Sequence, residues 1–360
     1  MTATSQREAT MGSAGDLARL RSGSRSRKGR QRSQGQILPR VSVVIPTCRR
    51  DASLRRLLQA LTRQDLPPEA FEIIVVDDAW SPTTPAVVEQ VAREAPGLSL
   101  SLLPGPHRGP AGARNVGWRR ARGAIIAFID DDAFPADNDW LRAGLNAFDE
   151  SHVAAVTGPV HVPVDDPPTD FQRNVQRLEH ADFLTCNAFC RRSALVAIDG
   201  FDERFTAPYR EDSDLQFRLE AAGGRHVRSE RAVVVHPAPP GPFAVSLRLQ
   251  RYSRFNALIY RKHPQRYRAE LEAGPPWHYY AIVALELAAL RALLSSRRRR
   301  AALFLAAWFW LEARFFLRRV RGTTHAPRHL LDMALTSLAI PPLSIYWRLR
   351  GAVRYRVWFF

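Results

Sequence analysis

A short apolar run that ends in three carboxylates constrains the fold of this chain more than any other feature. The run is 124–129, and Asp130, Asp131 and Asp132 follow it directly. Such a segment is typical of a strand buried on both faces of a parallel sheet, and ligands bind beyond the carboxyl ends of such strands. Adjacent carboxylates repel one another, and a divalent cation that bridges to phosphate oxygens is the natural counter-charge. The pattern therefore predicts a metal–diphosphate site, with an exposed acidic turn in which Asp132 caps a helix as the alternative.

Segments with strand and helix patterns alternate on both sides of this run. Further strands are predicted at 41–45, 73–76, 100–103, 153–157, 184–190 and 232–235, and helices at 54–61, 109–122, 140–148 and 212–222. Between them, 159–180 contains several prolines and is expected to be less regular. Strands that alternate with helices indicate βαβ units. We therefore predict an α/β fold with a mostly parallel central sheet flanked by helices, over residues 40–242.

The charge balance and the first residues favour anionic partners. Lys and Arg number 52 against 35 Asp and Glu, a formal net charge of +17, which suits nucleic acid, anionic lipid or phosphorylated substrates. Residues 1–39 are basic, poor in apolar residues and without a secretory signal pattern. We expect a disordered tail there, either merely solvated or attracted to an anionic membrane surface. The 3 cysteines form no CxxC pair, which indicates a reduced compartment without a disulfide framework.

The last third, residues 243–360, differs in amino-acid composition. A basic and aromatic stretch at 246–270 precedes apolar runs at 277–294, 301–317 and 329–347. These runs approach the roughly 20 residues of a membrane span. They contain Glu286, Arg291, Glu312 and Arg314, and we expect Asp332 and Pro341-Pro342 to interrupt the third run. We predict about three membrane-associated helices, spanning or lying in the interface, with a soluble helical subdomain as the alternative.

Polar residues that could bind ligands or take part in catalysis cluster after the predicted strands. Asp77-Asp78 ends the strand at 73–76, and if this strand is central and parallel the pair shares a rim with Asp130 to Asp132. A carboxylate there can accept hydrogen bonds from a nucleobase or ribose. Arg114 and Asn115 open a helix after two glycines, where a helix N-terminus attracts phosphate. A surface salt bridge is the alternative for Arg114.

A third acidic pair, Glu211-Asp212, precedes a helix that it could merely cap. The segment holds one carboxylate more than a cap requires, and a carboxylate that faces an acceptor hydroxyl can take its proton as a general base. His236 ends the last predicted strand and can offer an imidazole to a metal or a diphosphate. The alternative for His236 is a core or rim histidine.

Taken in order, these pieces resemble the family 2 glycosyltransferases of the GT-A fold. The matching segments cover roughly 41–240 and are Val43-Val44-Ile45-Pro46-Thr47, Val75-Val76-Asp77-Asp78, Gly112-Ala113-Arg114-Asn115-Val116-Gly117, Phe128-Ile129-Asp130-Asp131-Asp132, Asn187 with Arg191-Arg192, Gly200-Phe201-Asp202-Glu203-Arg204-Phe205, and Glu211-Asp212-Ser213-Asp214-Leu215. The resemblance implies a Rossmann-like GT-A domain. It also implies metal-dependent, inverting transfer of a sugar from a nucleotide-diphosphate sugar to a glycan or lipid-linked acceptor.

Carried over by position, the resemblance assigns roles to individual residues. Asp212 is implied as the catalytic base and Glu211 as a residue that positions the acceptor. Asp130 and Asp132 are implied as the DXD motif, with Asp132 as the main ligand of Mn²⁺ or Mg²⁺. His236 is a further candidate ligand on its own chemistry, outside the resemblance. The donor nucleotide is expected along Pro46, Thr47, Asp78, Arg114, Asn115 and Asp130.

Two positions depart from the family pattern. Ala79-Trp80-Ser81 stands where Gly-Ser often follows the aspartates, and Arg210 stands where a glycine is common. The first departure bears on the nucleotide contacts and the second on the shape of the acceptor side.

The alternatives are a nucleic-acid-binding basic protein, a dinucleotide-dependent oxidoreductase and a non-catalytic membrane scaffold. The basic residues concentrate in the tail and the last third, among apolar helices, so we expect no nucleic-acid partner. Gly109, Gly112 and Gly117 do not make the GxGxxG pattern of dinucleotide binding. The intact acidic motifs argue against an idle scaffold. We expect the enzyme at the cytoplasmic face of the cell membrane, because the arginine clusters between the apolar runs favour that side.

Overall fold

The computed structural model describes residues 38–150 and 152–359. Residues 37–360 form one compact unit. The predicted tail at 1–39 therefore lies almost wholly outside the described residues. The division into domains at 40–242 and 243–360 stays a prediction.

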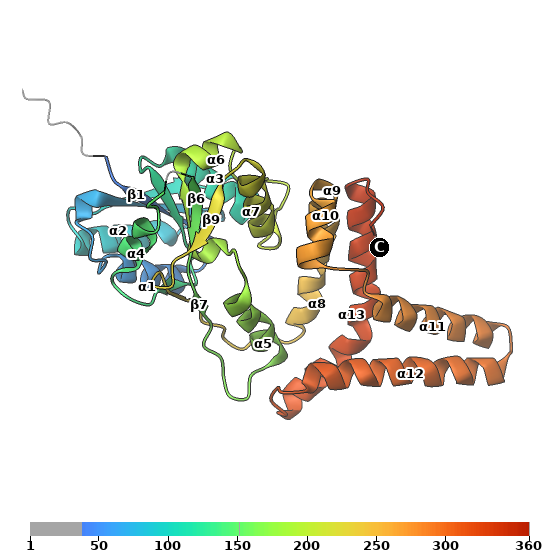
Figure 1. Cartoon of the computed structure of the whole chain (residues 1–360). Helices are drawn as coiled ribbons and strands as arrows, with labels where there is room; N and C mark the ends of the chain where they lie inside the picture. The colour runs from blue at the N-terminus through green and yellow to red at the C-terminus, as the bar shows by residue number, and fades with distance from the viewer. Residues whose placement is uncertain (1–37, 151, 360) are drawn as a thin grey trace, which may run out of the picture. The chain divides into compact units, whose positions relative to one another are not determined.

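The central sheet has seven strands in the order β3-β2-β1-β4-β8-β6-β9 (Figure 1). β1 pairs in parallel with β2 and β4, β2 with β3, and β6 with β9, whereas β8 is antiparallel to both its neighbours. The predicted mostly parallel sheet is confirmed. The strands are β1 Val41–Thr47, β2 Phe71–Asp77, β3 Ser99–Pro104, β4 Ile125–Phe128, β6 Val153–Thr157, β8 Ala188–Arg191 and β9 Arg225–Arg228.

Helices cover both faces of this sheet because its strands are apolar on both sides. Along β1, Val43 and Ile45 pack with α1, α2 and α4, whereas Val44 packs with α3, α6 and α7. Successive side chains of a strand point to opposite faces, which explains the division. These helices are α1 Asp51–Leu61, α2 Thr84–Glu94, α3 Pro110–Arg120, α4 Trp140–Asn146, α6 Arg192–Ala197 and α7 Glu211–Ala221.

A second sheet of three strands, in the order β5-β10-β7, lies outside the central one. Its strands are β5 Phe134–Pro135, β7 Val160–His161 and β10 Val234–Val235. The strand predicted at 232–235 is therefore shorter and belongs to this sheet. The strand predicted at 184–190 begins only at Ala188, because Thr185–Asn187 forms a 3-10 turn.

The irregular stretch 159–180 contains one helix that matters below, α5 Asp170–Gln176. Thr169 starts it with a capping box, since its hydroxyl accepts from the Gln172 backbone N–H while the Gln172 side chain accepts from the Thr169 backbone N–H. The remaining short elements are the 3-10 turns Pro68–Ala70, Arg177–His180 and Gln250–Ser253 and the π-helical turn Tyr267–Leu271.

The last third is helical, and its bounds follow the apolar runs closely. α11 and α12 run back along one another and α13 packs against α9 (Figure 1). α13 continues through Pro341-Pro342, so the expected interruption is wrong; the two prolines remove backbone donors without ending the helix. The helices are α8 Val245–Leu249, α9 Arg254–Lys262, α10 Pro264–Arg266, α11 Trp277–Leu294, α12 Arg298–Val320 and α13 Pro327–Arg354.

By length and composition, two described helices could cross a membrane, α11 and α13. Two such helices are weak evidence, because core helices of soluble proteins pass the same test. α12 is not among the helices that are apolar enough over 18 residues. By length and composition, two described helices rather than the expected three or so could therefore cross a membrane.

Candidate active site

A cavity of about 710 Å³ opens at the carboxyl edge of the central sheet. The parallel register sets this edge, because Thr47 at the end of β1 lies opposite Asp77 at the end of β2. The lining of the cavity includes the ends of β1 and β2 (Pro46, Thr47, Asp78), the start of α3 (Gly109, Pro110, Arg114), the acidic run with His236, and the segment Arg251, Tyr252 and Arg254.

Asp131, the middle residue of the acidic run, anchors the loop after β1. The Thr47 hydroxyl donates to its Oδ2 at 2.7 Å, and Arg50 pairs with its Oδ1 at 3.1 Å. Burial, strengthened by the neighbouring Asp132, raises the pKa of Asp131 to about 6 although Arg50 opposes the shift. Asp131 is the middle residue of the motif, to which the DXD pattern assigns no role. Its side chain thus fixes the carboxyl end of β1 to the carboxyl end of β4.

Asp132 and His236 meet on the cavity wall. His236 Nε2 lies 3.5 Å from Asp132 Oδ1, and Arg50 also pairs with Asp132. The buried Nδ1 of His236 has no hydrogen-bond partner among the residues that the structure describes. A carboxylate with an imidazole suits Mn²⁺, and Mg²⁺ is commonly held by one or two carboxylates with substrate phosphates. The donor set therefore fits a divalent ion that takes its remaining ligands from a diphosphate and water.

Asp130 does not join that pair. Among the described residues, no group of three or more His, Cys, Asp and Glu side chains is arranged to hold a metal. Asp130 Oδ1 lies 2.6 Å from Arg114 Nη2 instead. Two of the three predicted metal ligands thus come together, and the third is paired with a guanidinium.

Arg114 is buried between two carboxylates. Its side chain is 2% exposed, and its Nη1 lies 3.2 Å from Glu211 Oε1 in addition to the contact with Asp130. Burial alone would lower the pKa of Arg114, but Asp130 and Glu211 raise it above the ordinary value. This guanidinium joins α3, the end of β4 and the start of α7. The predicted role of Arg114 in binding diphosphate stays a prediction, since its guanidinium group already pairs with Asp130 and Glu211.

The Glu211-Asp212 pair forms the first turn of α7. Asp212 is partly exposed, and its Oδ1 accepts a hydrogen bond of 2.6 Å from the Thr185 hydroxyl. Burial raises the pKa of both carboxyls, and that of Glu211 reaches about 8 with the help of the adjacent Asp212 charge. Neither residue lines the 710 Å³ cavity, but Asp212 is close enough to raise the pKa of Arg114. A carboxylate with a raised pKa is suited to proton transfer near neutral pH.

Asp77 and Asp78 have different partners. Asp77 accepts from the backbone N–H groups of Ala79 and Ser81 and so fixes the turn after β2. Asp78 accepts from the N–H of Gly109 at 2.8 Å. Gly109 has φ +83°, and a Cβ there would lie 2.5 Å from the carbonyl oxygen of Thr206, so only glycine fits this approach.

Asn115 does not reach the cavity. Its side chain donates to the carbonyl of Phe201 and to Glu203, and it accepts from the Phe201 N–H and the Trp118 indole. The structure thus places this predicted donor-binding residue on the face of α3 that meets the 200–203 segment, which it secures.

Sequence reasoning missed several residues at the site, because their partners lie far away along the chain. Arg50 reaches Asp131 over 81 positions, and Thr185 reaches Asp212 over 27. Arg251, Tyr252 and Arg254 belong to the basic and aromatic stretch that the sequence singled out, but nothing in its pattern indicated that it borders the acidic edge.

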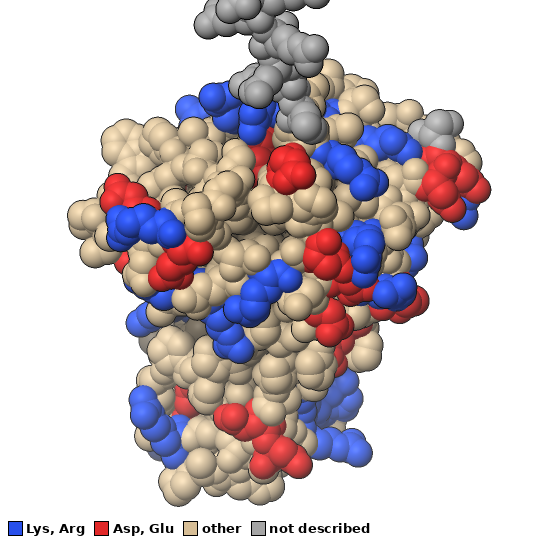
Figure 2. Space-filling view, turned by 90° about the vertical axis from the view of Figure 1, so that its left-hand side faces the viewer, with Lys and Arg blue, Asp and Glu red and all other residues tan. Residues whose placement is uncertain are grey.

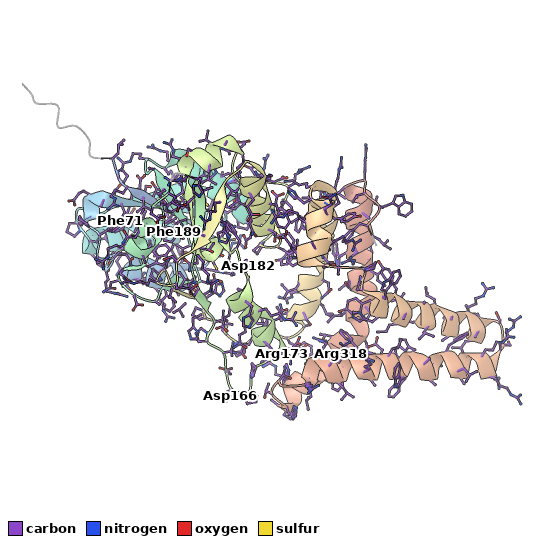
Figure 3. The ribbon with its side chains drawn as sticks, viewed as in Figure 1. Phe71, Asp166, Arg173, Asp182, Phe189 and Arg318 are labelled. Carbon is purple, nitrogen blue, oxygen red and sulfur yellow. The ribbon has the colours of Figure 1, made fainter. Side chains whose placement is uncertain are left out.

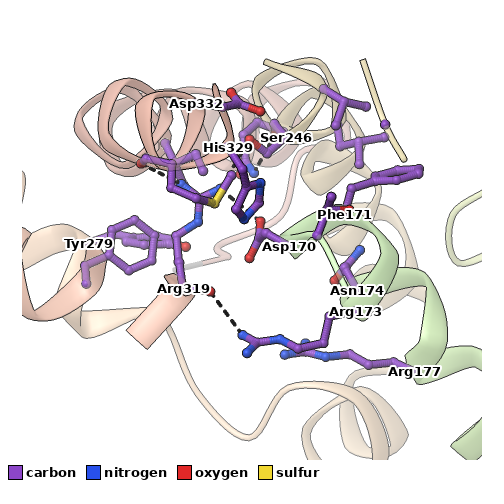
Figure 4. A pocket seen from close by; sticks show the side chains of 18 residues that line it. Asp170, Phe171, Arg173, Asn174, Arg177, Ser246, Tyr279, Arg319, His329 and Asp332 are labelled. Carbon is purple, nitrogen blue, oxygen red and sulfur yellow. Dashed lines mark hydrogen bonds and ion pairs between the residues drawn. The ribbon is translucent and has the colours of Figure 1, made fainter. Parts of the chain in front are cut away.

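A second cavity, of about 260 Å³, lies between α5 and helices α8, α12 and α13 (Figure 4). Arg319 of α12 crosses it to Asp170 at the start of α5, with Nη2 2.9 Å from Oδ2. Arg173 donates to the carbonyl groups of Arg319 and Arg321, and Figure 3 shows Arg173 beside the end of α12 that carries Arg318. These contacts fix the C-terminal helices to α5, which also lines the active-site cavity through Val175.

Comparison with known proteins identifies the α/β part of the chain. Residues 42–201 match the family model for Glycosyl transferase family 2. This family is the one that the sequence-based prediction named, so the fold and the enzyme class agree with that prediction.

Individual relatives match parts of this chain. Glycosyltransferase AglE of Haloferax volcanii is 27% identical over 212 residues, which cover 56% of this chain and 68% of AglE. The GalNAc(5)-diNAcBac-PP-undecaprenol beta-1,3-glucosyltransferase of Campylobacter jejuni is 33% identical over 95 residues, 26% of this chain and 30% of that protein. The mannosyltransferase PcManGT of Pyrobaculum calidifontis, solved with GDP-Man and Mn²⁺, has a TM-score of 0.53 at 23% identity, covering 89% of this chain and 87% of that one. This likeness supports the GT-A fold.

Proposed function

We propose that this family 2 enzyme transfers a sugar from a nucleotide-diphosphate sugar to an acceptor hydroxyl by a single, inverting displacement. The observation that carries the proposal is the meeting of three acidic motifs at one edge of the sheet. Asp132 faces His236, Asp130 shares Arg114 with Glu211, and Asp212 follows Glu211 on the same turn. The set supplies a site for a donor diphosphate beside a carboxylate of raised pKa.

The donor side consists of residues that line the cavity. Pro46, Thr47 and Asp78 lie along the proposed nucleotide path, and Arg114 and Asp130 border the diphosphate end. Asp132 and His236 would hold a Mn²⁺ or Mg²⁺ ion. The mannosyltransferase with the similar fold was solved with GDP-Man and Mn²⁺. Such an ion, when bound, neutralises the charge that develops on the leaving diphosphate.

Asp212 acts as the base in this proposal. Thr185 donates to its Oδ1 and leaves Oδ2 for the proton of the acceptor hydroxyl. Glu211 is held by Arg114 and orients the acceptor side of the same turn. Because Asp212 takes its proton on the face opposite the departing diphosphate, the anomeric configuration inverts.

A lipid-linked or polysaccharide acceptor suits the apolar surface of the C-terminal helices. Leu303, Trp310 and Leu317 recur at intervals of seven on α12, so they share one face, and they are 71%, 62% and 63% exposed. The Campylobacter relative carries an undecaprenol-linked substrate in its name. A membrane lipid at the cytoplasmic face would bring such an acceptor to the enzyme.

The charges on α11 and α12 favour helices that lie in the membrane interface. Arg297 to Arg300 stand at the turn between the two helices. If the pair spanned the bilayer, this cluster would cross to the far side, against the positive-inside tendency. Within the part of the chain described, no ion pair joins Glu286, Arg291, Glu312 and Arg314; Glu312 is buried and the other three are exposed. Exposed charges of this kind suit the headgroup level.

The nucleic-acid alternative finds little support on the surface. Figure 2 shows Lys and Arg side chains interspersed with Asp and Glu over the face drawn, rather than gathered into one basic surface. A nucleic-acid site is expected to form a basic patch or stripe.

Replacement of the base tests the proposal. Asp212→Asn should lower kcat about 10²-fold or more, the scale of a lost general base, with the donor-induced rise in melting temperature unchanged. Asp165→Asn, at an exposed aspartate, is the matched control. The active donor is first found by screening nucleotide-sugars for a melting shift with Mn²⁺ present. Near-full activity of Asp212→Asn, or a product with retained configuration, would exclude this mechanism.

A further inference from the structure

Arg210, the residue before the catalytic pair, adopts a backbone conformation that side chains disfavour. Its φ is +76°, in the left-handed region, and it stands at the N-cap of α7. A residue with a Cβ is rare there unless the surroundings hold it in place. This backbone sets the direction in which α7 begins, and therefore where Glu211 and Asp212 lie.

The side chain of Arg210 is held by the C-terminal helices. Its Nε donates to Asn256 Oδ1 of α9 at 2.8 Å, and its Nη2 lies 3.4 Å from Glu272 Oε1. Asn256 in turn donates to the same Glu272 oxygen at 2.7 Å, and Arg348 of α13 pairs with the other oxygen at 2.9 Å. Asn256 and Arg348 are buried. Glu272 is thus the common anion between two guanidinium groups.

A second contact reaches the same turn of α7 from α9. Asp214 is fully buried, and its Oδ1 lies 2.5 Å from Lys262 Nζ and 3.0 Å from His263 Nε2. The C-terminal helices therefore hold α7 on both sides of Glu211-Asp212, at positions 210 and 214. Neither contact involves a residue that lines the donor cavity.

We propose that Glu272 and Arg210 are positioning residues, through which the C-terminal helices fix the catalytic pair for transfer. This inference rests on the proposed function, since it assumes that Asp212 is the base. Glu272 keeps Arg210 in the left-handed conformation and neutralises Arg210 and Arg348 together. Without its charge the two guanidinium groups face one another, and the start of α7 is released from the orientation that the acceptor hydroxyl requires.

The first test is Glu272→Gln in the full chain, which keeps the shape and removes the charge. Glu270→Gln is the matched control, because Glu270 lies two positions before Glu272 and pairs with Arg266 on the exposed side. We expect kcat to fall about 10- to 100-fold for Glu272→Gln, the scale of a misplaced catalytic group. The KM of the donor and the melting shifts with Mn²⁺ plus UDP or GDP should stay as in the unmodified enzyme. If Glu272 had a merely structural role, the variant would lose stability but would not show a lower kcat with an unchanged donor KM.

A second variant separates backbone from side chain. Arg210→Gly favours the positive φ but lacks the contacts with Asn256 and Glu272, so we expect it to lose kcat to a similar extent. Arg210→Lys keeps a charge toward Glu272 and should recover part of the activity. Because glycine relieves the backbone, Arg210→Gly decides the question even if Glu272→Gln does not fold.

The outcomes distinguish the two proposals. Full activity of both Glu272→Gln and Arg210→Gly would overturn the positioning role while leaving the transferase function intact. Equal losses of donor binding and kcat would also overturn it, because they would place the network on the donor side. An unmodified chain that transfers no sugar from any donor would instead refute the proposed function.

Discussion

Removal of Arg114 is expected to weaken the fold in a way that depends on pH. Arg114→Met keeps much of the side-chain volume but leaves Asp130 and Glu211 facing one another without a counter-charge. Breaking a buried pair in this way costs about 3–5 kcal/mol. The lower end should apply at pH 7 and the upper end at pH 9.

The pH dependence follows from the raised pKa of Glu211. Burial and the Asp212 charge raise it from 4.5 to about 8, so the folded state binds more protons than the unfolded chain between these values. The protonated carboxyl therefore contributes stability below pH 4.5 that is lost as the pH rises toward 8. Without Arg114 the folded-state pKa of Glu211 rises further, so the loss extends to higher pH.

Thermal unfolding at pH 7 and pH 9 measures this effect. For a domain of this size, about 1 kcal/mol corresponds to about 2–4 °C, so about 3–5 kcal/mol lowers the melting temperature by about 6–20 °C. Glu211→Gln and the double variant complete the cycle, and at pH 9 the double variant should recover part of the loss. A cost below about 1 kcal/mol would refute the reasoning, because buried pairs cost more to break. An equal cost at both pH values would refute it as well.

Three further predictions address the site and the membrane. Asp132→Asn should abolish transfer with Mn²⁺ and leave the melting temperature of the donor-free enzyme within a few degrees of Asp165→Asn; near-full activity would show that Asp132 is not a metal ligand. Glu211→Gln removes a carboxyl whose pKa burial raises to about 8, so the fall in melting temperature between pH 7 and pH 9 should be smaller than in the unmodified enzyme; an unchanged fall would show that Glu211 does not titrate in this range. The full chain should sediment with membranes, whereas a chain ending near Pro242 should not; release of the full chain by a salt wash alone would indicate electrostatic attachment, and a full chain that stays soluble throughout would exclude the membrane role.

The fold was largely predictable because its strands are apolar on both faces. The run before Asp130 is buried from Ile125 to Ile129, and α11 begins and ends where the apolar run does. β9 was missed because Arg225 and Arg228 make it a polar edge strand without an apolar pattern. The reversal at β8 was equally hidden, since an apolar strand reads the same in either direction.

The sequence brought the acidic residues of the site to attention, but not their partners. Positions after predicted strands indicated Asp78 and Asp132, because the carboxyl edge of a parallel sheet collects ligand-binding residues. Asp212 stands at the start of a predicted helix, and its role came from the family resemblance. The pairing of Arg114 with Glu211 spans 97 positions, and no local pattern fixes such a contact. For the same reason the contact between Asp130 and Arg114 could not be predicted, and the set of metal ligands stays a prediction.

The long separations within the helical contacts also set an order of events during synthesis. β1 to β4 are complete once residue 128 has been made, but Asp170 gains Arg319 only 149 positions later, and Glu272 gains Arg348 76 positions later. At roughly 5–20 residues per second, the first of these intervals lasts roughly 7 to 30 seconds. During that time the emerging chain has β1 to β4 but lacks the contacts that secure α5. The last strand of the central sheet ends at Arg228, so a ribosome that stalls between residues 228 and 319 leaves a nascent chain with every strand of this sheet and an unsupported α5.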